Sequence, residues 1–393
     1  MSTINQPRWQ PVAQQAEFNT ADEDMSVIQR VHCLITEAIY QRASDIHFEP
    51  YENEFRIRYR LDGLLIQVAS PPQALAGRII SRIKIMANLD ISERRIPQDG
   101  RIRHNYSPQH SADLRVSTCP TIDGEKVVIR ILDTAIDELV IDELGFNELQ
   151  KNHFLHAISK SQGMILVTGP TGSGKSRTLY TALNQLNTPD KNISTAEEPV
   201  EIKVAGINQV NVNPKVGLSF ATTLRAFLRQ DPDIIMLGEI RDLETADIAI
   251  KAAQTGHLLL STLHTNSAAE TLTRLLNLGL SAVNIASSVS LIIAQRLVRQ
   301  LCPHCKVAST TTLSFKACGC ERCNQGYRGR IGLFEVMPIS KTIRQQMMAG
   351  ESSLQILQQA KDEGMISLYE AGLEKIKNGI TTLEEVIRVT TVD

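Results

Sequence analysis

The chain has 393 residues, of which 42% are hydrophobic and 21% charged, the balance of an ordinary globular protein with two or three domains. Its formal net charge of −2 excludes an overall basic field for nucleic acid. The first residues lack the apolar segment of a secretory signal, and no apolar run reaches the roughly 18–20 residues of a membrane span. We therefore expect a cytoplasmic protein.

The first elements in chain order predict a small α+β domain over residues 26–135. Residues 1–25 are polar and lack periodicity, which predicts a flexible tail. Asp62 and Gly63 predict a hairpin turn between two strands. The predicted helices are 27–40 and about 76–87, and the predicted strands are 45–48, 54–60, 64–68, 112–117 and 126–131. An acidic linker is expected at 136–150.

A second domain is predicted over residues 151–393, where strands alternate with helices. This alternation indicates an α/β fold with a mostly parallel sheet covered by helices. The predicted strands are 164–167, 192–195, 234–237 and 258–261. After residue 339 the sequence predicts only helices, with Thr381 and Glu384 as the capping box of the last one.

Residues 169–176 read Gly-Pro-Thr-Gly-Ser-Gly-Lys-Ser and fit the phosphate-binding pattern G-x-x-x-x-G-K-[ST]. The glycines let backbone N–H groups turn toward phosphate, and the following helix adds its positive end. We expect the Lys175 ammonium to reach the β- and γ-phosphates and the Ser176 hydroxyl to bind Mg²⁺. The predicted nucleotide-binding residues here are Gly169, Pro170, Thr171, Gly172, Ser173, Gly174, Lys175, Ser176 and Arg177. The alternative is a glycine-rich turn without a ligand.

Hydrolysis of a nucleotide also needs carboxylates that place Mg²⁺ and orient the attacking water. Glu239 ends an apolar strand, so it is expected at the carboxyl edge of the sheet, where open α/β sheets bind ligands. Glu197 and Glu198 end another strand in the same way. Solvated loop acids are the alternative interpretation.

Two histidines and two arginines are further candidates. His257 and His264 bracket the apolar run 258–263, where a histidine could sense the γ-phosphate or simply end the strand. Arg225 and Arg229 are four residues apart, which predicts one shared helix face. Two guanidinium groups suit phosphate charge, although a solvated basic face would have the same pattern.

Five of the seven cysteines fall within residues 302–323. Cys302 and Cys305 form one C-x₂-C pair, Cys320 and Cys323 form another, and 14 residues separate the pairs. This spacing predicts a structural zinc site, which has no open coordination position and therefore no catalytic role. Cys318 is a spare thiol that could replace Cys320.

Together these motifs resemble the traffic ATPases of type II secretion and type IV pilus assembly, over nearly all of residues 26–393. The segments that carry the resemblance, besides 169–176, are 42–50, 60–63, 95–101, 113–117, 124–126, the "Asp box" 197–199, the Walker B segment 238–239 and the "His box" 255–257 with 263–266. The cysteine pairs followed by residues 326–335 are similar to the extension and secretion motors of this family, whereas its retraction motors generally lack those cysteines.

The resemblance implies a RecA-like ATPase domain preceded by a PAS-like domain, with a zinc knuckle at about 300–330 and a helical part at about 340–393. ATP would lie between the two domains, with Arg101 and Arg115 closing over the phosphates beside the arginine pair. Glu197 would orient water and Glu239 would hold Mg²⁺, or these roles could be exchanged. Glu198 stands where the family usually has Asp.

The resemblance further implies a homohexameric motor that acts on an inner-membrane platform protein and adds or lifts pilin-like subunits, peripherally at the bacterial inner membrane. The resemblance does not distinguish among secretion, pilus assembly and DNA uptake as the process that this motor serves. Two other functions are considered: an ATP-binding scaffold that switches without turnover, and a DNA-translocating ring ATPase. No direct nucleic-acid contact is expected, because the net charge is −2 and only 4% of residues are aromatic.

Overall fold

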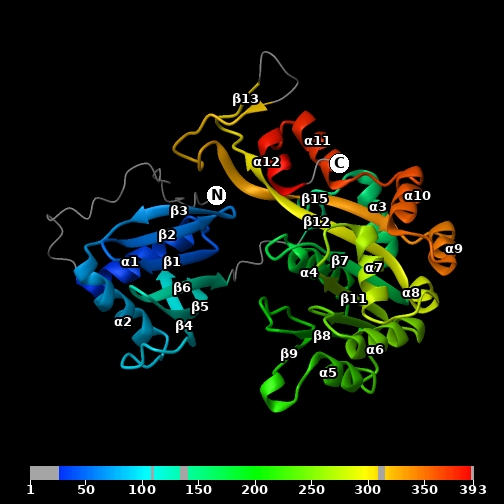
Figure 1. Ribbon diagram of the computed structural model, residues 1–393, viewed down its shortest axis with the longest axis horizontal. Coiled ribbons are helices and arrows are strands. Elements are labelled where there is room, and N and C mark those ends of the chain that lie inside the picture. Colours follow the sequence, from blue (N-terminus) through cyan, green and yellow to red (C-terminus); the bar gives the residue numbers. More distant parts are fainter. Residues whose placement is uncertain (1–25, 108–109, 133–139, 309–314, 391–393) are drawn as a thin grey trace. The chain divides into compact units, whose positions relative to one another are not determined.

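The computed structural model describes residues 26–107, 110–132, 140–308 and 315–390, and the predicted tail and residues 136–139 of the predicted linker lie outside them. The chain divides into two compact units (Figure 1). The first unit comprises residues 1–136, 302–307 and 317–329, and the second comprises 137–301, 308–316 and 330–393. The predicted α/β class of the whole chain is confirmed.

The first unit contains a sheet with the strand order β3-β2-β1-β6-β5-β4. Neighbouring strands run antiparallel. Asp62 and Gly63 have φ angles of 48° and 91°, as the predicted tight hairpin turn requires. The elements are α1 (Val27–Tyr40), β1 (Asp45–Pro50), β2 (Phe55–Leu61), β3 (Leu64–Ala69), α2 (Ala76–Met86), β4 (Gln98–Ser107), β5 (His110–Thr121) and β6 (Gly124–Leu132). Strand β4 was not predicted.

One face of this sheet packs on α1 and α2 and forms the hydrophobic core of the unit. Because side chains alternate along a strand, the residues between the core positions lie on the opposite face. A row of five residues crosses that face from strand to strand: Arg101, Arg115, Arg130, Asp45 and Arg60. The two predicted phosphate-binding arginines of this unit, Arg101 and Arg115, are therefore direct neighbours.

A buried ion pair ties α2 to the start of β6. The Lys84 Nζ atom donates to Glu125 Oε1 at 2.8 Å and to the Glu93 carbonyl at 2.6 Å, and both paired side chains are almost fully buried. Replacing Glu125 with alanine would leave a buried ammonium without its carboxylate. We expect this change to lower the free energy of unfolding by about 3–5 kcal/mol.

The measurement is urea unfolding of wild type and Glu125→Ala. The double variant Lys84→Met/Glu125→Leu should recover most of the loss, because it removes both charges and keeps apolar volume. Arg78→Ala changes an exposed arginine of α2 and serves as the control, with little change expected. Equal stability of Glu125→Ala and wild type would show that this pair does not stabilise the unit.

The second unit contains a sheet with the strand order β15-β12-β7-β11-β10-β8-β9. From β12 to β9 each neighbouring pair of strands is parallel. The four predicted strands are confirmed as β7, β11, β10 and β8, the adjacent strands at the centre of the sheet. The strands here are β7 (Gly163–Thr168), β8 (Ile193–Glu197), β9 (Asn208–Asn211), β10 (Ile234–Leu237), β11 (Leu258–Leu263) and β12 (Val289–Leu301), with β15 (Tyr327–Pro338) at the edge and the short strands β13 (Val307–Ala308) and β14 (Phe315–Lys316).

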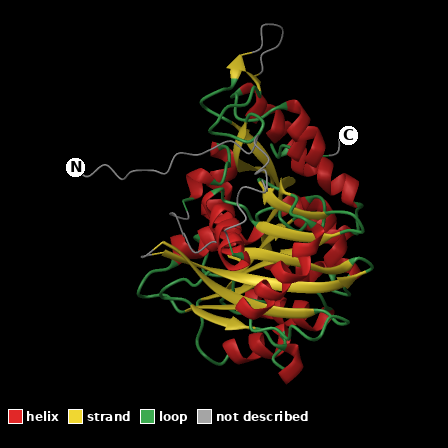
Figure 2. Cartoon of the chain, turned by 90° about the vertical axis from the view of Figure 1, so that its left-hand side faces the viewer, coloured by secondary structure: helices red, strands yellow, loops and turns green. Residues whose placement is uncertain are grey.

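Helices cover both faces of this sheet, because a separate hydrophobic core lies on each face. Figure 2 shows the helices of the chain in red and the strands in yellow. Met164 and Leu166 of β7 enter the core beneath α5–α10, whereas Ile165 and Val167 enter the core beneath α3 and α4. The helices are α3 (Glu148–Ile158), α4 (Lys175–Leu186), α5 (Phe220–Phe227), α6 (Leu243–Gln254), α7 (Ala268–Asn277), α8 (Ala282–Ser288), α9 (Lys341–Ala349), α10 (Ser353–Asp362), α11 (Leu368–Lys377) and α12 (Leu383–Val389).

The all-helical end of the chain is confirmed, but its predicted capping box is wrong by one residue. Thr382, and not Thr381, caps α12 by accepting a hydrogen bond from the Glu385 backbone N–H. Thr381 is buried, and its hydroxyl donates to the Arg299 carbonyl at 2.8 Å. None of the described helices is both long and apolar enough to span a membrane.

Candidate nucleotide-binding and zinc sites

The predicted phosphate-binding loop joins the buried strand β7 to α4, which begins at Lys175. Gly169 and Gly174 have φ angles of +145° and +90°, a region that side-chain-bearing residues rarely adopt. A Cβ atom would lie 2.5 Å from the Gln295 carbonyl oxygen at Gly169 and 2.8 Å from Gln295 Nε2 at Gly174. The loop backbone therefore packs directly on the middle of β12, where only glycine fits.

The start of α4 has the features of an anion site. Its N-cap is Gly174, so no side chain caps the helix, whose first N–H groups have no partner within the helix. The Lys175 ammonium donates to the loop carbonyls of Gly169 at 2.8 Å and Pro170 at 3.1 Å. Burial lowers the pKa of Lys175 to about 8, although the Glu239 charge opposes this shift. At pH 7 the group is still largely protonated, and phosphate would supply its missing counter-charge.

Carboxylates gather at the carboxyl edge of the same sheet, around Arg241. This guanidinium contacts Glu239 Oε1 at 2.6 Å and Glu198 Oε2 at 3.0 Å. His264 Nε2 lies 3.4 Å from the second Glu239 oxygen. The hydrogen bond from Arg241 outweighs partial burial and lowers the pKa of Glu239. The structure thus brings together Glu198, Glu239 and His264, with Glu239 close enough to Lys175 to affect its charge.

Glu197 lies elsewhere, although it is adjacent to Glu198 in sequence. Its carboxylate is buried and accepts hydrogen bonds from the Tyr180 hydroxyl, from Thr195 Oγ1 at 2.6 Å and from Gln209 Nε2 at 3.3 Å. Burial raises the pKa of Glu197 in spite of these bonds. The structure therefore brings Glu198, and not Glu197, to the carboxylate cluster.

The remaining predicted residues have other partners. His257 precedes β11 and its Nδ1 lies 3.0 Å from the Ala252 carbonyl, so the full strand separates it from His264. The exposed Arg225 pairs with Glu244 at 2.8 Å, and Arg177 pairs with Glu143 at 3.2 Å.

The shared helix face predicted for Arg225 and Arg229 is wrong, because α5 ends at Phe227. Arg229 lies beyond the C-cap Leu228, and its guanidinium folds back to donate to the Arg225 carbonyl at 2.9 Å.

Sequence reasoning missed Arg241, Gln295 and Arg296. Gln295 Oε1 accepts from the Thr178 hydroxyl of α4 at 2.8 Å, and Arg296 donates to the Asn266 carbonyl at 3.2 Å. Gln295 and Arg296 reach the loop because β12 pairs in parallel with β7, with Ala294 opposite Thr168. Recognition of β12 as a neighbour of β7 would have placed both residues beside the loop.

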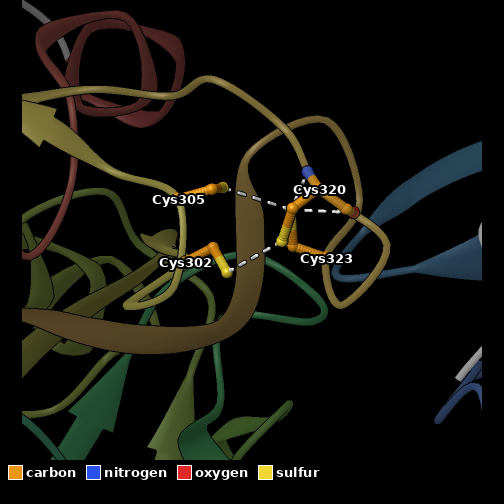
Figure 3. A group of neighbouring side chains, drawn as sticks. All are labelled: Cys302, Cys305, Cys320 and Cys323. Atoms are coloured by element: carbon orange, nitrogen blue, oxygen red, sulfur yellow. Dashed lines mark hydrogen bonds between the residues drawn. The ribbon is translucent and has the colours of Figure 1, made fainter. Parts of the chain in front are cut away.

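The four cysteines of the predicted zinc site come together from two segments of the first unit, with their side chains directed toward one another (Figure 3). Their sulfur atoms all lie within 4.8 Å of one another. The Sγ–Sγ distances are 3.9 Å for Cys302–Cys320 and 3.6 Å for both Cys305–Cys323 and Cys320–Cys323. Tetrahedral zinc with Zn–S bonds of about 2.3 Å would separate the sulfurs by about 3.8 Å, so the cluster fits zinc. Cys318 is exposed and is not part of this cluster.

Comparison with known proteins gives concordant results. The family described as type II/IV secretion system protein matches residues 20–388. The chain is 55% identical over 393 residues to the type IV pilus assembly ATPase PilB of Pseudomonas aeruginosa, covering 96% of this chain and 69% of the relative. It is 46% identical over 384 residues to the type II secretion system protein E of Dickeya dadantii, covering 94% of this chain and 76% of that relative.

Among solved structures, the ATPase DotB of Legionella pneumophila has the same fold, with a TM-score of 0.70 and 21% identity over 92% of this chain and 94% of that chain. The family match spans most of the chain and includes both the phosphate-binding loop and the cysteine cluster. The chain therefore belongs to the type II/IV secretion system protein family.

Proposed function

We propose that this protein is an ATPase whose hydrolysis of ATP drives the assembly of a type IV pilus or a type II secretion pseudopilus. The observation that carries this proposal is the uncapped start of α4 with Lys175, placed at the same sheet edge as Glu239 and Glu198. The Pseudomonas relative named above is a pilus assembly ATPase, and the Dickeya relative is a type II secretion protein.

The side chains divide the chemical work. Lys175 and the first N–H groups of α4 would hold the phosphates. The Ser176 hydroxyl and the Glu239 carboxylate are oxygen ligands of the kind that Mg²⁺ prefers, and bound Mg²⁺ would neutralise charge on the β- and γ-phosphate oxygens. Glu198 lies beside Glu239 and has access to solvent, with 30% of its side chain exposed, so it joins Glu197 and Glu239 as a candidate for orienting water.

The larger assembly is also part of this proposal. We place the protein in the cytoplasm as a homohexameric ring beside the inner membrane, where it would act on a platform protein. Arg101 and Arg115, neighbours on the open sheet face of the first unit, would close over the bound phosphates. Zinc would hold the two cysteine segments together and take no part in hydrolysis.

The proposal is tested with Glu239→Gln, which keeps the shape of the side chain and removes its charge. Hydrolysis of MgATP by the full chain should fall by roughly 10²-fold or more. ATP binding, measured by calorimetry, should persist because the phosphate-binding loop is intact. Glu384→Gln, which changes an exposed glutamate of α12, is the control and should hydrolyse ATP like wild type.

Three results would count against the proposal. An unchanged rate in Glu239→Gln would exclude this carboxylate from the reaction. A wild-type protein that binds ATP without turnover would be a switch or scaffold. Hydrolysis that depends on DNA would indicate a translocase.

A further inference from the structure

Arg241 holds a position that the proposed ATPase reaction does not explain. It follows Glu239 by two residues. Its two terminal nitrogens contact the carboxylates of Glu239 and Glu198, which follow the ends of two different strands, β10 and β8. The side chain of Arg241 is 57% exposed, whereas those of Glu239 and Glu198 are 22% and 30% exposed. A solvent-facing cation therefore neutralises two less exposed anions at the carboxyl edge of the sheet.

The three groups must rearrange when a divalent ion arrives. Mg²⁺ requires close oxygen ligands in nearly octahedral geometry, and both Glu239 oxygens already face basic groups, Oε1 the Arg241 guanidinium and Oε2 the His264 ring. The guanidinium would also repel a divalent cation at this short range. The other described basic groups near the pair are His264, whose Nε2 lies 3.4 Å from Glu239, and Lys175, whose pKa the Glu239 charge affects.

We propose that Arg241 is a built-in counter-ion that neutralises Glu198 and Glu239 until Mg²⁺ enters with the nucleotide. The proposal rests on the ATPase function proposed above and adds an order of events to it. Before nucleotide binds, Arg241 keeps free Mg²⁺ away from these carboxylates. The ion then enters with ATP, whose phosphates supply further ligands and the charge that displaces Arg241. Arg241 is thus a positioning residue that sets when the metal binds.

The test is Mn²⁺ binding to the nucleotide-free full chain, followed by the loss of the electron paramagnetic resonance signal of free Mn²⁺. Wild type should bind Mn²⁺ weakly in this state. Arg241→Gln removes the charge and should tighten Mn²⁺ binding about tenfold or more. Adding Glu198→Gln to that variant should abolish the gain. Arg274→Gln, which changes an exposed arginine of α7, is the control and should bind like wild type.

A second variant keeps the proposal testable if Arg241→Gln folds poorly. Glu198→Asp retains both carboxylates but shortens one of them, so it should weaken the bridge and give Mn²⁺ affinity between those of wild type and Arg241→Gln. Steady-state hydrolysis of ATP by Arg241→Gln should also saturate at a lower Mg²⁺ concentration than hydrolysis by wild type.

Equal or weaker Mn²⁺ binding in Arg241→Gln would overturn the counter-ion proposal, because Arg241 would then only brace the two carboxylates. That result would leave the ATPase function standing if wild type still hydrolyses MgATP. Absence of hydrolysis in wild type would instead contradict the proposed function, whatever the Mn²⁺ titration shows.

Discussion

Replacement of Lys175 with alanine is expected to abolish both tight nucleotide binding and ATP hydrolysis. The Lys175 ammonium is the only side-chain cation that the phosphate-binding loop itself contributes. Its present partners are two loop carbonyls, which are dipoles and not full charges. Without it, the phosphates would lose their nearest charge-assisted hydrogen bonds. We expect hydrolysis to fall by about 10³-fold or more, since electrostatic groups of this kind dominate phosphoryl transfer.

The measurement is phosphate release from MgATP together with calorimetric titration of a non-hydrolysable ATP analogue. Lys251→Ala is a matched control, because Lys251 is an exposed lysine of the same unit that pairs with Asp247 on α6. It should bind and hydrolyse nucleotide like wild type. A Lys175→Ala protein with wild-type affinity and rate would show that the loop between β7 and α4 is not the phosphate site.

Loss of zinc is expected to unfold the segments around the four cysteines. Cys302 and Cys323 are buried, and the two segments are otherwise short loops with little core of their own. In small zinc modules the metal contributes on the order of 10 kcal/mol to folding. We expect Cys302→Ser to lose its zinc and to show fast amide hydrogen exchange throughout residues 302–307 and 317–329, together with a lower Tm.

The zinc content of purified protein, measured by atomic absorption, should be one per chain in wild type and close to zero in Cys302→Ser. Cys318→Ser is the control, and it also tests whether Cys318 replaces Cys320 as a zinc ligand. It should retain zinc and slow exchange, because the Cys318 sulfur lies outside the cluster of four. Zinc loss in Cys318→Ser, or full protection of both segments in metal-free protein, would contradict the assignment.

The fold could be predicted where burial is continuous along the sequence. All residues of the four central strands of the second unit are buried, and three of these strands, β7, β10 and β11, are short, mostly apolar runs. Edge strands do not have this pattern, and β9 reads Asn-Gln-Val-Asn with no residue fully buried. Strand β12 is long and includes Gln295 and Arg296 at its middle, where it packs on the phosphate-binding loop. Its polar residues reflect a tertiary contact that local periodicity does not contain.

The candidate site likewise contains residues that local sequence patterns predict and residues whose position depends on tertiary packing. The phosphate-binding loop and the cysteine pairs are local patterns, so the sequence alone predicted them. Glu197 and Glu198 are consecutive, and at the end of a strand consecutive side chains point in opposite directions. The packing of Tyr180 and the position of β10 determine which of the two carboxylates enters the core and which faces Arg241. The motif specifies neither.

The most direct test of the central claim is calorimetric titration of the wild-type full chain with a non-hydrolysable ATP analogue and Mg²⁺. We predict that the analogue binds saturably and that ATP competes with it for the site. The nucleoside without phosphates should not bind, and Lys175→Ala should bind neither the analogue nor ATP. The absence of binding heat in properly folded, zinc-loaded protein would contradict the claim that the loop between β7 and α4 holds a nucleoside triphosphate.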